Sequence, residues 1–263
     1  MNKQEHRVKP TDRTDLRPAI RRAPASRGIS FWEDLPPNIR DKVESPISEA
    51  ERWLMDKYQH GYESPYIPLA RFWTGGRQIE RQRNPMACTF VAAANAFRIL
   101  DGQSNYFTSE SIRARLSARG IRANELNEEA LQALIESGYP YNRFQTGRVA
   151  RHRGTHELPT DVLKFLNAID SGSVATLGWK SRPDFGDPPG EPLLHTRTII
   201  GFGIEARTLF FHTIDPFIGT VEQWSFRDLI AATGKSLSLH ASNVVRIANA
   251  SIGREATLIR RKI

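Results

Sequence analysis

Cysteine is almost absent from this sequence, since Cys88 is the only one among 263 residues. A single cysteine excludes an internal disulfide and fits a reducing compartment. Long apolar runs are also missing, and none approaches the roughly 20 residues that a helix needs to span a bilayer. No apolar stretch follows the basic N-terminus, so we expect no cleavable signal peptide. We therefore expect no membrane span, and a protein that is cytoplasmic or exported without a cleavable signal peptide by a specialised secretion system.

Acidic residues are fewer than basic ones, 29 against 37, which leaves a formal net charge of +8. The whole surplus lies in residues 1–28 and 253–263, whereas residues 29–252 balance to zero. A nucleic-acid-binding domain normally carries its basic patch on the folded body. We therefore expect no specific nucleic-acid partner and interpret both ends as solvated segments.

Composition divides the chain into four segments. Residues 1–28 are rich in Arg, Pro, Thr and Ser and poor in aromatic residues, which predicts a disordered basic leader. Residues 29–66 form a partly helical N-terminal extension, with apolar side chains at helical spacing in its second half. Residues 67–252 are predicted to be one domain, and residues 253–263 a basic C-terminal tail.

The periodicity of the 67–252 domain changes from helical to extended along the chain. Residues 88–100 are alanine-rich, apolar on most faces and free of Gly and Pro, which predicts a buried central helix. Further helices are expected at 108–119, 127–137 and 160–169, with a polar connection at 142–159. Val, Ile, Thr and Phe then predict strands at 173–179, 195–203, 207–214 and 242–247. Helices followed by strands indicate an α+β domain with a mostly antiparallel sheet.

Cys88 stands at the predicted start of the central helix. Proline disfavours helix at the residue before it, so Asn84-Pro85 implies that the helix begins near Ala87 or Cys88. A sulfur at the positive end of a helix dipole has a lowered pKa, and only the thiolate is nucleophilic. A free cysteine more often just packs in a core, however. Cys88 is therefore a candidate nucleophile that needs a base to accompany it.

Among the seven histidines, His195 is the best candidate for that base. It opens a strand directly after a long loop rich in Pro and Gly, where a side chain can face a cleft. His152 and His156 have the i, i+4 spacing of a helical metal pair, but Gly154 between them argues against a helix. We therefore expect no metal site there.

Asp215 is the expected partner of His195. The two strands meet at a turn near Glu205, and a hairpin centred there brings His195 opposite a residue close to 215. Pro216 keeps the residue before it out of the helical region. A carboxylate beside a histidine fixes its tautomer and stabilises the imidazolium. The segment 215–219 can also be no more than a turn, and it can be both.

Gln82, six residues before the cysteine, completes the candidate set. Attack of a thiolate on an amide carbonyl creates a negatively charged oxygen that needs hydrogen-bond donors. The backbone N–H of Cys88 is one such donor, and the side-chain amide of Gln82 is the second. These residues predict covalent catalysis by Cys88, with His195 and Asp215 as its partners, and require no cofactor and no metal.

This arrangement resembles the papain-like cysteine peptidases. The match consists of Gln82-(x5)-Cys88 opening a central helix, His195 starting a strand, and Asp215 in an Asp-Pro pair. It is most similar to the compact bacterial branch: the double-glycine leader peptidases of bacteriocin exporters, and effector proteases that pathogens deliver into host cells. Their pattern of histidine, apolar strand, G-x-G or similar turn, strand, Asp-Pro and a later tryptophan is similar to residues 195–224.

The resemblance covers about residues 67–250 and implies a papain-like fold, in which a helical lobe packs on the sheet. It implies a cysteine peptidase that hydrolyses peptide or isopeptide bonds of a protein or peptide substrate. The neighbours Ala87 and Thr89 depart from the relatives, which often have Asp or Gly beside the cysteine. Two alternatives stay open: a transglutaminase-like acyltransferase, and a catalytically idle papain-like module that binds a protein partner. Gln82 favours the hydrolase.

Overall fold

A computed structural model of the chain describes residues 21–22, 32–33, 79–84, 87–101, 106–122, 124, 126–148, 166–180, 194–228 and 257–261. It also describes single residues and short runs between 37 and 64. Most of the leader, the loop at 181–193 and the expected strand at 242–247 lie outside these residues, as do His152 and His156.

Three α-helices follow one another in the first half of the domain: α3 (Cys88–Asp101), α4 (Ser109–Ala118) and α5 (Glu128–Glu136). Each lies within two residues of a predicted helix. α4 begins at a capping box, in which the Thr108 side chain accepts from the Ser111 N–H and the Ser111 hydroxyl accepts from the Thr108 N–H. The Asn127 side chain accepts from the Ala130 N–H at the start of α5. A 3₁₀ turn, η3 (Tyr141–Arg143), follows.

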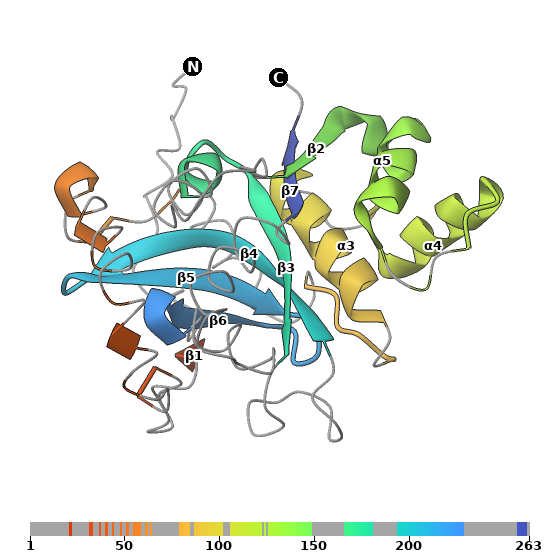
Figure 1. The fold of residues 1–263 in the computed structure, drawn as a ribbon. Helices are drawn as coiled ribbons and strands as arrows, with labels where there is room; N and C mark the ends of the chain where they lie inside the picture. Colours follow the sequence, from red (N-terminus) through yellow and green to blue (C-terminus); the bar gives the residue numbers. More distant parts are fainter. Residues whose placement is uncertain are drawn as a thin grey trace, which may run out of the picture.

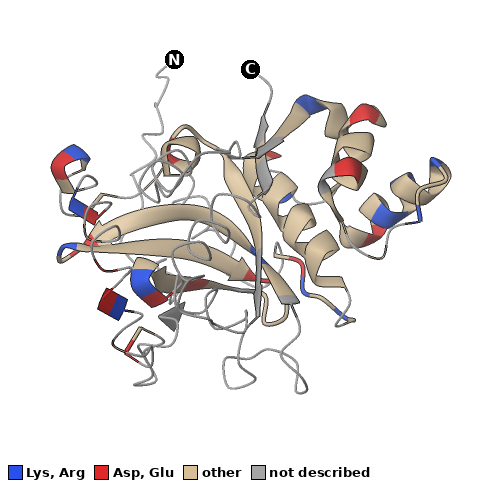
Figure 2. Ribbon diagram, in the orientation of Figure 1, with Lys and Arg blue, Asp and Glu red and all other residues tan. Residues whose placement is uncertain are grey.

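Helix α3 is the centre of the hydrophobic core. All but two of its residues are buried, including Phe90 and Phe97, and it contacts α4, β3, β4 and β7. Figure 1 shows it between the strands and the α4–α5 pair. Charged residues are scattered along α4 and α5 but are almost absent from α3 (Figure 2). A helix that is apolar nearly all round has to be buried, as the sequence predicts.

Seven strands form one sheet in the order β1-β6-β5-β4-β3-β7-β2. The five inner strands of the sheet are β3 (Val174–Lys180), β4 (Leu194–Glu205), β5 (Thr208–Asp215), β6 (Thr220–Ser225) and β7 (Thr257–Arg261). The edges are β1 (Arg21–Arg22) and β2 (Phe144–Arg148). Every pairing is antiparallel except the one between β1 and β6. Helices together with a mostly antiparallel sheet confirm the α+β class.

Four strands differ from the sequence expectation. The first is β1, whose residues Arg21 and Arg22 pair with β6 although they belong to the leader predicted to be disordered. Thr257–Arg261 lies in the segment interpreted as a solvated tail, but it forms β7 between β3 and β2, with Ile259 fully buried. Residues 144–148 form β2, although a polar connection was expected there. β6 was not expected as a strand. These strands are short and rich in polar residues, so their periodicity is weak and distant partners decide their conformation.

The β4–β5 hairpin aligns the strands that carry His195 and Asp215. Ala206 and Arg207 form its two-residue turn with φ values of 44° and 67°, and Glu205 pairs with Thr208. Positive φ at both turn residues is typical of the type I′ turns that match strand twist. A register shift between Ile199 and Gly201 interrupts the ladder, after which Thr198 pairs with Ile214.

The N-terminal extension packs directly on the domain. Gly61 donates a backbone hydrogen bond to Ile204, Ser64 donates one to Phe202, and Ile204 donates one to Tyr62. These bonds continue the edge of β4 beyond the part that β3 covers. The hydroxyls of Tyr58 and Tyr62 both donate to Asp170, in a second contact.

A third contact joins the extension to the segment after β6. The Arg227 guanidinium lies 2.6 Å from a Glu44 oxygen and 2.8 Å from a Glu51 oxygen, and it stacks over the Trp32 ring. The backbone N–H of Trp32 donates to Asp228 at 3.1 Å. The described residues of the extension therefore contact both β4 and the segment that follows β6.

We predict that Arg227→Met lowers the free energy of unfolding by about 1–2 kcal/mol, because it leaves two partly buried carboxylates without their cation. The surface pair between Arg40 and Glu33 provides the control, and Arg40→Met should cost less than about 0.5 kcal/mol. Thermal denaturation of the full chain measures both variants. Equal shifts in Tm would show that the Arg227 contacts do not hold the extension on the domain.

Candidate active site

Cys88 is the first residue of α3, and its side chain is only 7% exposed. A turn precedes it, in which the Ala87 N–H donates to the Asn84 carbonyl at 2.9 Å. The N–H groups in the first turn of a helix have no acceptor within the helix, and they give that end a partial positive charge. The sulfur and the N–H of Cys88 therefore lie where a negative charge is stabilised.

His195 lies near the start of β4, between Cys88 and Asp215. Its Nε2 is 3.1 Å from Asp215 Oδ1, and both side chains are buried. The imidazole also forms a hydrogen bond with the Cys88 thiol. The structure thus brings together the three residues that the sequence singles out, in the order thiol, imidazole and carboxylate.

The strand register explains the position of Asp215. Thr198 pairs with Ile214, so the next pair along the ladder is Arg197 with Asp215, and His195 lies one diagonal step away. Directly after the strand, Asp215 Oδ1 accepts from the Phe217 N–H at 2.7 Å, and the Asp215 carbonyl accepts from the Gly219 N–H at 2.8 Å. The side chain therefore caps its own turn while it contacts the histidine.

Contacts with two residues lower the pKa of the Cys88 thiol by more than burial raises it. Burial alone raises the pKa of the thiol, but hydrogen bonds from His195 and from the backbone and hydroxyl of Thr196 bring it below its ordinary value. Thr196 is a contact that the sequence did not indicate, because its partner lies on a distant helix. The outcome favours the thiolate.

The pKa values of His195 and Asp215 move in the directions that support a charged pair. Burial lowers the pKa of His195, but the hydrogen bonds to Asp215 and Cys88 raise it above its ordinary value. Burial raises the pKa of Asp215, but the charge of Arg197 and the contact with His195 bring it well below its usual range. The site therefore favours a thiolate and an imidazolium beside an ionised carboxylate.

Gln82 approaches the same site from the segment before α3. Its backbone N–H donates to the Pro216 carbonyl at 2.7 Å, which ties it to the turn after Asp215. The side chain is 8% exposed, and neither its Nε2 nor its Oε1 has a hydrogen-bond partner among the residues that the structure describes. An unpaired buried amide costs free energy, so it is typical of a group that serves a ligand.

Two further contacts fix the Gln82 segment. Asn95 lies two helical turns after Cys88, and its side chain accepts from the Glu80 N–H at 2.8 Å and donates to the Glu80 carbonyl at 3.1 Å. A spacing of seven residues places Asn95 and Cys88 on the same helix face. Gly219 packs so closely on Arg81 that a Cβ there would lie 2.2 Å from Arg81 Cγ.

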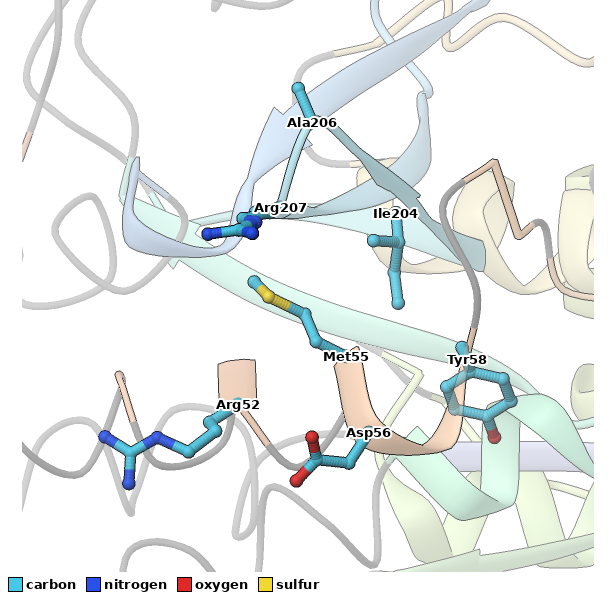
Figure 3. Close-up of a pocket in the computed structure, with 7 residues that line it drawn as sticks. All are labelled: Arg52, Met55, Asp56, Tyr58, Ile204, Ala206 and Arg207. Carbon is cyan, nitrogen blue, oxygen red and sulfur yellow. The ribbon is translucent and has the colours of Figure 1, made fainter.

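The structure also contains a hollow that lies far from these residues. A cavity of about 720 Å³ is lined by the N-terminal extension and the tip of the β4–β5 hairpin. Figure 3 shows Met55 reaching into it between Arg207 and Ile204. Ile204 is nine residues along β4 from His195, which is roughly 30 Å of extended chain. This cavity therefore does not contain the candidate site.

Within the described part of the chain, no group of three or more His, Cys, Asp or Glu side chains is arranged to hold a metal ion. None of the helices described is both long and apolar enough to cross a membrane.

A scan against models of known protein families and a search of curated proteins each find no match. The function has to be inferred from the geometry of this chain.

We predict that the rate at which Cys88 reacts with iodoacetamide has its pH midpoint below the ordinary thiol pKa of about 8.5. Because the thiol pKa is lowered, its thiolate is retained as the pH falls and is lost only below that shifted value. His195→Ala should move the rate profile up toward the ordinary value. Mass spectrometry reads the reaction directly, since Cys88 is the only cysteine.

The urea-unfolded chain gives the reference profile of an unperturbed thiol. If the folded and unfolded chains share the same pH midpoint, the ion pair between Cys88 and His195 does not form.

Proposed function

We propose that this chain is a papain-like cysteine peptidase that hydrolyses peptide or isopeptide bonds of a protein or peptide substrate. The observation that carries the proposal is the buried array of Cys88, His195 and Asp215. Gln82 supports it, because its backbone binds the turn after Asp215 and its buried amide has no hydrogen-bond partner among the described residues. The α+β architecture, with the cysteine opening a buried helix against an antiparallel sheet, supports the papain-like assignment.

In the first half of the reaction, the Cys88 thiolate attacks the carbonyl carbon and forms a C–S bond. The carbonyl π electrons move to the oxygen, where the Cys88 N–H and the Gln82 amide donate hydrogen bonds. When the C–N bond breaks, the imidazolium of His195 gives its proton to the leaving amine. An acyl-enzyme thioester and a neutral imidazole remain.

In the second half, His195 takes a proton from a water molecule that attacks the thioester carbonyl. Collapse of the new tetrahedral intermediate breaks the C–S bond, releases a carboxylic acid and restores the thiolate with the imidazolium. Asp215 stays ionised throughout and holds the ring through its 3.1 Å contact. A transglutaminase-like acyltransferase would follow the same first half, but an amine would replace the water.

The direct test compares wild type with Cys88→Ala on a peptide library and on ubiquitin-like conjugates. We expect wild type to cleave at least one substrate class and the variant to lose turnover. Mass spectrometry of reactions with added primary amine separates acid from amide products, and therefore hydrolysis from acyl transfer. Equal turnover by the two proteins would exclude Cys88 as the nucleophile, and no turnover by either, despite a reactive thiol, would favour the idle binding module.

We predict that Gln82→Ala lowers kcat by about 10²- to 10³-fold, the usual effect of losing one oxyanion donor. KM should change little, because the missing hydrogen bond forms mainly in the transition state. Alkylation of Cys88 should persist, because it creates no oxyanion. Gln132→Ala on the surface of α5 is the matched control and should leave kcat unchanged. Normal turnover by Gln82→Ala would remove Gln82 from the site.

A further inference from the structure

Arg197 contacts the oxygen of Asp215 that His195 does not use. Its Nη2 lies 2.8 Å from Asp215 Oδ2, whereas His195 Nε2 lies 3.1 Å from Oδ1. Arg197 is fully buried, with 0% exposure. The carboxylate is therefore shared, one oxygen for each cation.

The strand geometry brings both Arg197 and His195 to the same carboxylate. Arg197 is the cross-strand neighbour of Asp215, and His195 is two residues away on the same face of β4. Thr198, which faces the other way, donates to the Ala92 carbonyl of α3 at 2.7 Å. That bond fixes the rotation of β4 and therefore which side chains reach Asp215.

A second carboxylate lies on the far side of the guanidinium. Arg197 Nε is 3.9 Å from Glu222 Oε2, and the same oxygen accepts from the Trp224 indole N–H at 3.1 Å. The guanidinium also lies over the Trp224 ring, 5.7 Å from its centroid. A planar guanidinium with a close ion pair at one edge, a second carboxylate near the other edge and an indole ring against its face is more constrained in orientation than a lysine ammonium would be.

A gain in stability does not explain why Arg197 and Asp215 are buried together. A buried ion pair contributes little net stability compared with apolar side chains of similar volume, because each charge loses its hydration. Arg197 moreover opposes protonation of His195 through its own positive charge, while Asp215 favours it. The arginine thus acts on the histidine both through the orientation of Asp215 and through its field.

We propose that Arg197 is a positioning residue that aims Asp215 at His195 and offsets the carboxylate charge, so that the imidazolium can release its proton to the leaving amine. This role rests on the peptidase function proposed above. Without Arg197, the charge of Asp215 would raise the pKa of His195 further and make the imidazolium a weaker proton donor. Arg197 stays protonated through the cycle and exchanges no proton itself. Among the described residues, the charged groups around the histidine are Cys88, Arg197, Asp215 and, beyond them, Glu222.

Two substitutions should shift the pH dependence in opposite directions. Arg197→Met removes a positive charge, so the basic limb of the kcat profile, where His195 loses its proton, should move up by about half a pH unit or more. Glu222→Gln removes the negative charge behind Arg197 and should move that limb down. Arg197→Lys keeps the charge and should return the limb toward wild type, but with lower kcat because the two-edged fork is lost.

The imidazole ¹⁵N shifts of His195, assigned by comparison with His195→Gln, give the same titration without any substrate. If peptidase activity is never found, this titration still tests Arg197. If Arg197→Met does not fold, the downward shift in Glu222→Gln supports the proposal by itself. Unchanged His195 titration in a folded Arg197→Met, or shifts of both variants in one direction, would overturn it.

Discussion

The carboxylate of Asp215 holds the candidate site together. One oxygen accepts from the Phe217 N–H and contacts His195, and the other forms an ion pair with Arg197. The turn that follows carries the Pro216 carbonyl, which accepts from the Gln82 N–H. A displacement of Asp215 and its turn would therefore disturb both His195 and the backbone contact that holds the Gln82 segment.

Helix α3 supplies the fixed reference for these contacts. Its N-terminus carries Cys88. The Ala92 carbonyl accepts a hydrogen bond from the Thr198 hydroxyl, and the Asn95 side chain forms two hydrogen bonds with the backbone of Glu80. Because its residues are almost all buried, the helix cannot shift without disturbing the core. One rigid element thus positions Cys88, the strand that carries His195 and the Gln82 segment.

Local signals allowed much of this to be predicted from the sequence. The apolar pattern of residues 88–100 and the turn near Glu205 fix the central helix and the hairpin, and these two elements bring Cys88, His195 and Asp215 together. Long-range pairing is less readable: β7 follows a charged segment, and its strand partners lie about 80 and 110 residues upstream. Asn95 and Arg197 were equally hard to interpret, since a polar residue in an apolar segment shows only that a partner exists.

Burial of the site requires that its charges alternate. From α3 across the sheet, the order is the thiol of Cys88, the imidazole of His195, the carboxylate of Asp215, the guanidinium of Arg197 and the carboxylate of Glu222. The lowered pKa of Cys88 and the raised pKa of His195 favour the charged form of each. An unpaired charge at 0% exposure would be strongly destabilising, whereas here each charge has an opposite neighbour. The same order sets the pKa of His195, because the charge of Asp215 raises that pKa and the charge of Arg197 lowers it. The contacts that make a buried ion pair tolerable are therefore the contacts that would tune it for proton transfer.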